Sequence, residues 1–149
     1  MSPSQNKPTT SSILFIMDNN GIPDWELLYK KFASMMYRAI LRIVKDENAA
    51  EEILTQSFVL LKEKDFLNSL RRPLFISLLQ HASNTALVYM NEKGKKYEEF
   101  NKKLPLLDEL LYTNHSFGEL IQAADLKKEE AQKILIQELR QLRNVGQLN

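Results

Sequence analysis

The sequence predicts an all-α protein, made of a helical bundle followed by a small helix-turn-helix lobe. Apolar residues recur at steps of three and four along several stretches, which is the period of an amphipathic helix. Typical helix-start residues precede these stretches, among them Asp24, Asp46, Pro73 and Ser116. A lysine-rich segment then separates the last third of the chain from the rest. We therefore expect an N-terminal extension (1–23), a bundle (24–92), a linker (93–103), a second lobe (104–143) and a tail (144–149).

The N-terminal extension begins with polar residues. Residues 1–12 include two prolines, so we expect little order there unless another surface holds them. The apolar run Ile13–Met17 can act as an anchor, either as a short strand or as an extended segment in a groove. Met17 is also a candidate start of the natural chain. Asn19-Asn20-Gly21 predicts a turn before the first helix.

Two long helices follow, over about 24–44 and 46–61. The first places Trp25, Leu28 and Phe32 on one wide apolar face, and its cations are expected largely off that face: Lys30, Lys31, Arg38, Arg42 and Lys45. The second carries an apolar stripe of Ala50, Ile53, Leu54, Ser57, Phe58 and Leu61. A turn at Asp46 joins the two helices, so they should pack as an antiparallel hairpin.

The third helix is predicted over Pro73–Met90, after a connector at 66–72. Apolar residues cover so much of its circumference that it should lie at the centre of the bundle. The segment 93–103 after it has five lysines and two glutamates. Two interpretations stay open: a solvated connector, or a strip that faces phosphates at the end of the third helix.

The last third of the chain predicts three short helices. The first covers about 106–112, and Ser116 with Glu119 forms the capping box of the second. A turn at 124–126 leads to the third helix. One predominantly apolar side of that helix carries Ala131, Ile134, Leu135, Glu138, Leu139 and Leu142.

Composition excludes several classes of protein. The 149-residue chain has a formal net charge of +1, so nucleic-acid binding would have to come from local patches. Without cysteine there is neither a disulfide nor a thiolate metal site. His81, expected in a helix and partly buried, is far in sequence from His115, expected in a loop, so we predict neither a metal nor a cofactor. The run Ile13–Met17 is too short to span a bilayer, and we expect a cytoplasmic protein without a membrane partner.

No pattern of catalytic residues is present in the sequence. It lacks a glycine-rich phosphate loop and a nucleophile with a histidine at usable spacing. The adjacent Glu51 and Glu52 diverge by about 100° around a helix, so they are not a catalytic pair. We therefore predict a binding protein, not an enzyme, and no small-molecule substrate.

One long stretch of the sequence resembles a known family. The segment LYKKFASMMYRAILRIVKDENAAEEILTQSFVLLKEKDF, followed by LFISLLQHASNTALVYMNEKGKK, resembles the second conserved region of bacterial RNA polymerase sigma factors of the extracytoplasmic-function group. The resemblance covers 25–96, about half of the chain. The matching residues are Leu28, Tyr29, Phe32, Tyr37, Arg38, Ile40, Leu41, Ile43, Asp46, Ala50, Glu51, Phe58, Leu60, Leu79, Ala82, Asn84, Ala86 and Leu87.

The C-terminal segment HSFGELIQAADLKKEEAQKILIQELRQLR resembles the helix-turn-helix of sigma region four. Agreement lies at Ser116, Glu119, Leu126, Leu135 and the pair Leu142-Arg143. Asp125 stands where the family has the turn glycine, and it tolerates the left-handed backbone that such a turn needs. Ile121 stands where the family has a small alanine.

The resemblance implies a sigma-like transcription initiation factor that binds the clamp coiled coil of core RNA polymerase. The implied contact residues are Leu41, Glu51, Glu52, Thr55 and Gln56. Thr55 and Gln56 stand where the family has glutamine and an acidic residue, so a charge-assisted contact becomes a neutral one.

The resemblance also implies DNA contacts, but the chain departs from the family at many of them. Residues that can still hold the melted promoter strand are Asn84, Tyr89, Lys93, Lys95 and Lys96, whereas the family's tryptophan, arginine, aspartate and second arginine are replaced by Ser77, Ser83, Val88 and Asn91. Candidates for duplex contacts are Lys127, Lys128, Lys133 and Arg140, and usually basic positions hold Gln132, Ile134, Gln137 and Glu138.

We therefore expect promoter DNA binding to be weak or absent. The alternative function is a sigma-derived adaptor or negative effector, such as a decoy for an anti-sigma protein, that has lost promoter recognition. A third interpretation is a helical domain with only accidental likeness to the family.

Overall fold

The computed structural model describes residues 23–63, 70, 72–95, 104–113 and 115–144. This part consists of six helices and no strand, which confirms the all-α prediction. The helices are α2 (Trp25–Val44), α3 (Glu47–Glu63), α4 (Leu74–Glu92), α5 (Pro105–Tyr112), α6 (Phe117–Ala123) and α7 (Lys128–Arg143). None of these helices combines the length and the apolar character needed to cross a membrane. The predictions for 1–22, for 96–103 and for 145–149 lie outside the described residues.

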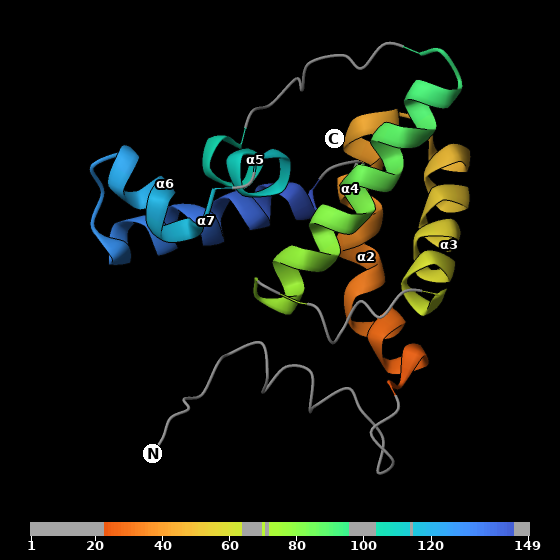
Figure 1. Ribbon diagram of the computed structural model, residues 1–149, viewed down its shortest axis with the longest axis horizontal. Coiled ribbons are helices and arrows are strands. Elements are labelled where there is room, and N and C mark those ends of the chain that lie inside the picture. Colours follow the sequence, from red (N-terminus) through yellow and green to blue (C-terminus); the bar gives the residue numbers. More distant parts are fainter. Residues whose placement is uncertain (1–22, 64–69, 71, 96–103, 114, 145–149) are drawn as a thin grey trace.

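Helices α2 and α3 form the expected antiparallel hairpin (Figure 1). The Asp24 carboxylate caps α2 by accepting from the Leu27 amide at 3.0 Å. Lys45 ends the helix in a left-handed conformation, φ 58°, and its amide donates to the Leu41 carbonyl at 2.8 Å. The left-handed conformation of Lys45 reverses the chain direction, and α3 begins two residues later at Glu47.

Helix α4 packs against both members of the hairpin and is central, as its wide apolar surface predicted (Figure 1). Leu78, Leu79 and Ala82 are completely buried in the core that α4 shares with α2 and α3. A polar contact also joins α4 to α3, because His81 Nε2 lies 2.9 Å from the Ser57 carbonyl oxygen. His81 is therefore the partly buried helix histidine that the sequence predicted.

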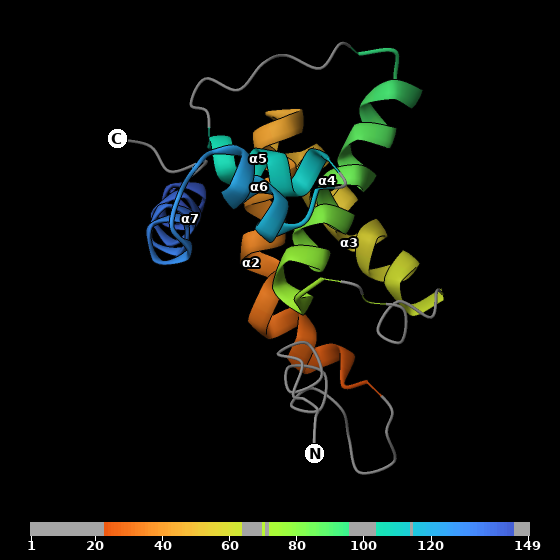
Figure 2. The same ribbon diagram turned by 60° about the vertical axis from the view of Figure 1, so that its left-hand side comes forward.

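The three C-terminal helices pack onto this bundle. Helix α5 contacts α4 and α7, α7 also reaches α2, and α6 packs against α5, so α5 lies between α4 and α7 (Figure 2). Their buried apolar residues belong to the same core as those of α2 to α4: Leu104, Leu106, Leu107, Leu110, Leu111, Leu120, Ala131 and Leu142.

The predicted local signals of this C-terminal part are confirmed. The Ser116 hydroxyl accepts from the Glu119 amide at 3.1 Å, and the Ser116 amide donates to the Glu119 carboxylate at 2.8 Å, which completes the capping box of α6. Asp125 takes the predicted left-handed conformation, φ 56°, in the turn before α7. His115 lies in the loop between α5 and α6, also as predicted.

Candidate functional site

The residues predicted to bind polymerase divide between the surface and the core. Glu51, Glu52, Thr55 and Gln56 are all exposed on α3, whose opposite side is buried through Ile53, Leu54 and Phe58. The Thr55 hydroxyl donates to the Glu51 carbonyl at 3.2 Å, so its oxygen keeps lone pairs that can accept a further hydrogen bond. These four residues form what we call the α3 face.

Leu41 does not belong to the α3 face. It lies on α2 and is only 8% exposed, within the apolar core. A leucine with so little exposed surface can support the partner surface from below but contributes little direct contact. Of the five residues predicted to bind polymerase, the four on α3 are therefore the ones whose side chains a partner can reach directly, and their role stays a prediction.

The residues predicted to hold single-stranded DNA do not lie on one side of α4. Tyr89 and Lys93 are together, with the Lys93 ammonium 5.6 Å from the centre of the Tyr89 ring. Asn84 is exposed but lies five positions before Tyr89, which is roughly 140° around the helix. Lys95 is exposed just beyond the helix, and Lys96 lies outside the described residues.

Two of the substituted positions in this strip point inward. Ser83 is completely buried and Ser77 is 9% exposed, with the Ser77 hydroxyl donating to the Arg72 carbonyl at 3.3 Å. Serine is small and fits the space between packed helices, whereas the arginine and tryptophan found here in the sigma factors that the sequence resembles are large. In this chain, both positions serve helix packing.

The residues predicted to contact duplex DNA are all exposed. Lys133 and Arg140 are seven positions apart and share one side of α7, whereas Lys128 lies five positions before Lys133 and points elsewhere. Lys127 precedes the helix, and its amide donates to the Glu130 carboxylate at 3.1 Å. The exposed Glu129 lies one turn before Lys133 and weakens the positive potential there.

The opposite side of α7 is buried and contains a carboxylate. Glu138 is 5% exposed and accepts from the backbone amides of Leu107 at 2.7 Å and Leu106 at 3.3 Å. These amides belong to the first turn of α5, where a helix attracts negative charge. Burial raises the pKa of Glu138, while the hydrogen bonds from the two backbone amides lower it by a smaller amount.

A buried ion pair joins α2 to α5. Arg42 Nη1 and Nη2 donate to the two carboxylate oxygens of Asp108 at 2.6 and 3.0 Å, and the same carboxylate accepts from the Leu104 amide at 3.1 Å. The expectation that Arg42 lies off the packed face was wrong, since it is only 8% exposed. Its partner comes from a helix 66 residues away, which the pattern of α2 alone cannot reveal. Beside this pair, burial raises the pKa of Tyr112 to about 12.

Arg72 holds the other end of α5. Its guanidinium donates to the carbonyl of Leu110 in the last turn and to those of Thr113 (3.2 Å) and His115 (2.5 Å) just beyond the helix. Carbonyls at the end of a helix lack partners within the helix, and Arg72 supplies donors for them. The sequence indicated only a connector here. Arginine suits the task because its planar fork presents several donors at once.

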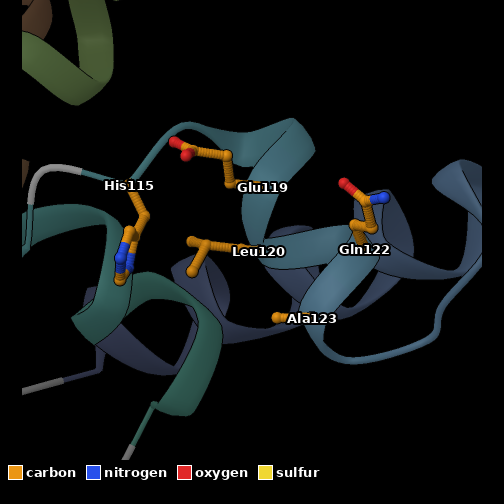
Figure 3. A pocket seen from close by; sticks show the side chains of 5 residues that line it. All are labelled: His115, Glu119, Leu120, Gln122 and Ala123. Atoms are coloured by element: carbon orange, nitrogen blue, oxygen red, sulfur yellow. The ribbon is translucent and has the colours of Figure 1, made fainter.

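A shallow hollow of about 370 Å³ lies beside α6 (Figure 3). His115, Glu119, Leu120, Gln122 and Ala123 line it, and the side chains of His115 and Leu120 point toward one another. The Glu119 carboxylate in this hollow already accepts a hydrogen bond from the Ser116 amide in the capping box. This hydrogen bond holds the pKa of Glu119 below its usual value. The His115 imidazole lies 3.8 Å from the Glu109 carboxylate. Both titratable groups of the hollow therefore have local structural partners.

Within the described ranges, no group of three or more histidine, aspartate or glutamate side chains is placed to hold a metal ion. Comparison with known proteins gives no further guide, because no family model, no curated protein and no solved structure matches the chain.

Proposed function

We propose that the chain is a sigma-like transcription initiation factor that binds core RNA polymerase through the α3 face. The observation that carries this proposal is the exposure of Glu51, Glu52, Thr55 and Gln56 on a helix anchored firmly in the core. Carboxylates steer a basic partner during encounter, and the hydroxyl and amide fix the register of the docked surfaces. The clamp coiled coil of polymerase is the partner that the family resemblance implies, and such binding would place the protein in the cytoplasm.

Reversing the charge of the α3 face tests this proposal. We expect Glu51→Lys with Glu52→Lys to reduce capture of the host's core RNA polymerase by at least about tenfold, because like charges then meet across the interface. Helicity and melting temperature should stay unchanged, since both side chains are exposed.

A matched control is Glu92→Lys with Glu129→Lys, which makes the same change in net charge at exposed positions on α4 and α7. This control should keep full capture. If the α3 variant binds polymerase as well as the control does, the proposed interface is wrong.

The second candidate is a sigma-derived adaptor or negative effector, such as an anti-sigma decoy, without promoter recognition. The observation that favours it is the burial of one side of α7, where Ala131 and Leu142 are completely buried and Glu138 caps α5. While α7 is docked in this way, Lys133 and Arg140 are the two predicted duplex contacts that share one exposed side of the helix. A side with so few aligned cations neutralises few phosphates, so binding should be weak.

A gel-shift titration at two salt concentrations separates the two candidates. We expect weak retention that falls with salt and is the same for the host's promoter duplex and for a scrambled duplex. The double variant Lys133→Ala with Arg140→Ala should remove most of what remains. A preference for the promoter on the order of 10³ at near-physiological salt would instead favour the complete initiation factor.

A further inference from the structure

An aromatic groove opens where the first turns of α2 meet the last turns of α3. Trp25 and Tyr29 of α2 and Phe58 of α3 form its apolar lining, and its volume is about 480 Å³. The rings of Tyr29 and Phe58 lie 4.9 Å apart at 52° to one another. Tyr29 is nevertheless 47% exposed, so the described residues leave one flank of this aromatic cluster open.

The rim of the groove is charged. Glu26 and Lys30 form an ion pair at 3.1 Å on α2, and Lys62 borders the groove from α3. Among the residues described, Lys62 has no ion-pair partner within 4.0 Å. The groove therefore suits an apolar strip that carries an acidic group at one end.

We propose that the N-terminal run Ile13–Met17 of this same chain binds the aromatic groove. The chain enters α2 through Pro23, two residues before Trp25, and 22 residues precede that point in the sequence. Ile13–Met17, outside the described residues, is five consecutive apolar residues followed by Asp18. This composition matches an apolar lining with a lysine at the rim.

Chain length permits this docking. Met17 lies six residues before Pro23, so the connecting chain can span up to about 20 Å when extended. The sequence Asn19-Asn20-Gly21 favours a turn, and a turn at this point would direct the run back toward α2. A tether this short gives an effective concentration on the order of millimolar, which favours the run over a second copy or a separate partner.

Trp25 reports the occupancy of the groove directly, because it is the only tryptophan in the sequence. In the full chain, Phe15→Asp with Ile16→Asp should shift the Trp25 emission to the red and raise its quenching by acrylamide about threefold or more. A synthetic peptide of residues 11–19 added to this variant should reverse both changes. The control Thr9→Asp with Thr10→Asp makes the same change in net charge beside the run and should leave Trp25 as in the unmodified chain.

Two results would overturn the proposal. Emission and quenching that are the same for the Phe15/Ile16 variant and the unmodified chain would show that the run does not cover Trp25. Emission that changes on dilution of the unmodified chain would assign the groove to a second copy. Circular dichroism accompanies each measurement, and the milder pair Phe15→Ala with Ile16→Ala replaces the aspartates if helicity falls.

Discussion

Glu138 shows how a single residue fixes the position of α7. A carboxylate removed from water costs free energy unless hydrogen bonds replace its hydration. Here two backbone amides at the start of α5 provide that replacement. Burial is still the larger influence, and the nearby Asp108 adds to it while Arg42 opposes it, so the net effect is a raised pKa.

This raised pKa predicts a specific dependence of stability on pH. A carboxyl group whose pKa is higher in the folded than in the unfolded chain contributes stability that is fully present below its ordinary value of 4.5. That contribution is lost as pH rises through the raised value. The free energy of unfolding of the unmodified chain, relative to that of Glu138→Gln, should therefore fall as pH increases from about 4.5.

Urea denaturation of both proteins at several pH values measures this difference. Glu129→Gln is the matched control, because Glu129 is exposed on the same helix and should give no such trend. A difference that grows with pH would mean that the amides of Leu106 and Leu107 outweigh the burial of Glu138.

At the scale of elements, α5 depends on residues outside itself. A helix of eight residues is too short to be stable alone in water. Glu138 of α7 binds its first amides, Arg42 of α2 binds Asp108, and Arg72 binds its last carbonyls. Three segments distant in sequence thus hold one short helix between α4 and α7.

We expect Arg72→Ala to loosen α5 before any other helix. The substitution leaves three carbonyls without their donor, and two of them, those of Leu110 and Thr113, are part-buried. A buried group left unsatisfied costs about 1–3 kcal/mol, and partial burial places these two toward the lower end of that range. Hydrogen exchange should accelerate over 105–113 while α3 stays protected. Arg72→Lys should restore only part of this protection, because an ammonium lacks the planar fork.

Arg140→Ala is the control for this measurement, since Arg140 is exposed on α7. Equal acceleration throughout the molecule in the Arg72 variant would contradict a local role for this residue.

Local signals predicted most of the helices. The expected starts at Asp24, Pro73 and Ser116 agree with the structure, because a cap depends on residues within one turn. The ends of α3 and α4 lie two residues beyond the predicted ones, at Glu63 and Glu92. Helix ends fray and carry weaker signals than caps.

The residues that join the helices could not be predicted in the same way. Arg42 and Arg72 looked like surface or connector residues, because their partners lie 66 and 38 to 43 positions away in sequence. Glu138 did carry a signal, since a glutamate on an otherwise apolar helix side indicates a buried acceptor. Exposure of the α3 face agrees with its helical period, but Leu41 belongs to the packed side of α2.

At the scale of the whole molecule, the bundle and the C-terminal helices share a core. Leu107 and Leu142 are completely buried in the same apolar cluster as Leu28 and Ile40 of α2. The sequence led us to expect two lobes joined by a linker at 93–103, and this division stays a prediction. The contacts of α5 and α7 with α4 and α2 favour lobes that remain docked.

Cutting the linker tests whether docking survives without the covalent connection. We expect a site-specific protease site placed after the exposed Lys95 to be cleaved without loss of helicity. The two fragments should then co-elute in gel filtration at micromolar concentration as one species of the intact mass, 17.3 kDa.

The Arg42–Asp108 pair and the apolar cluster still join the fragments after cleavage. With Asp108→Ala added, the fragments should dissociate at a higher protein concentration than without it. This substitution leaves the buried Arg42 guanidinium without its carboxylate. Elution of the cleaved but otherwise unmodified protein as two smaller species would show instead that the lobes are independent bodies.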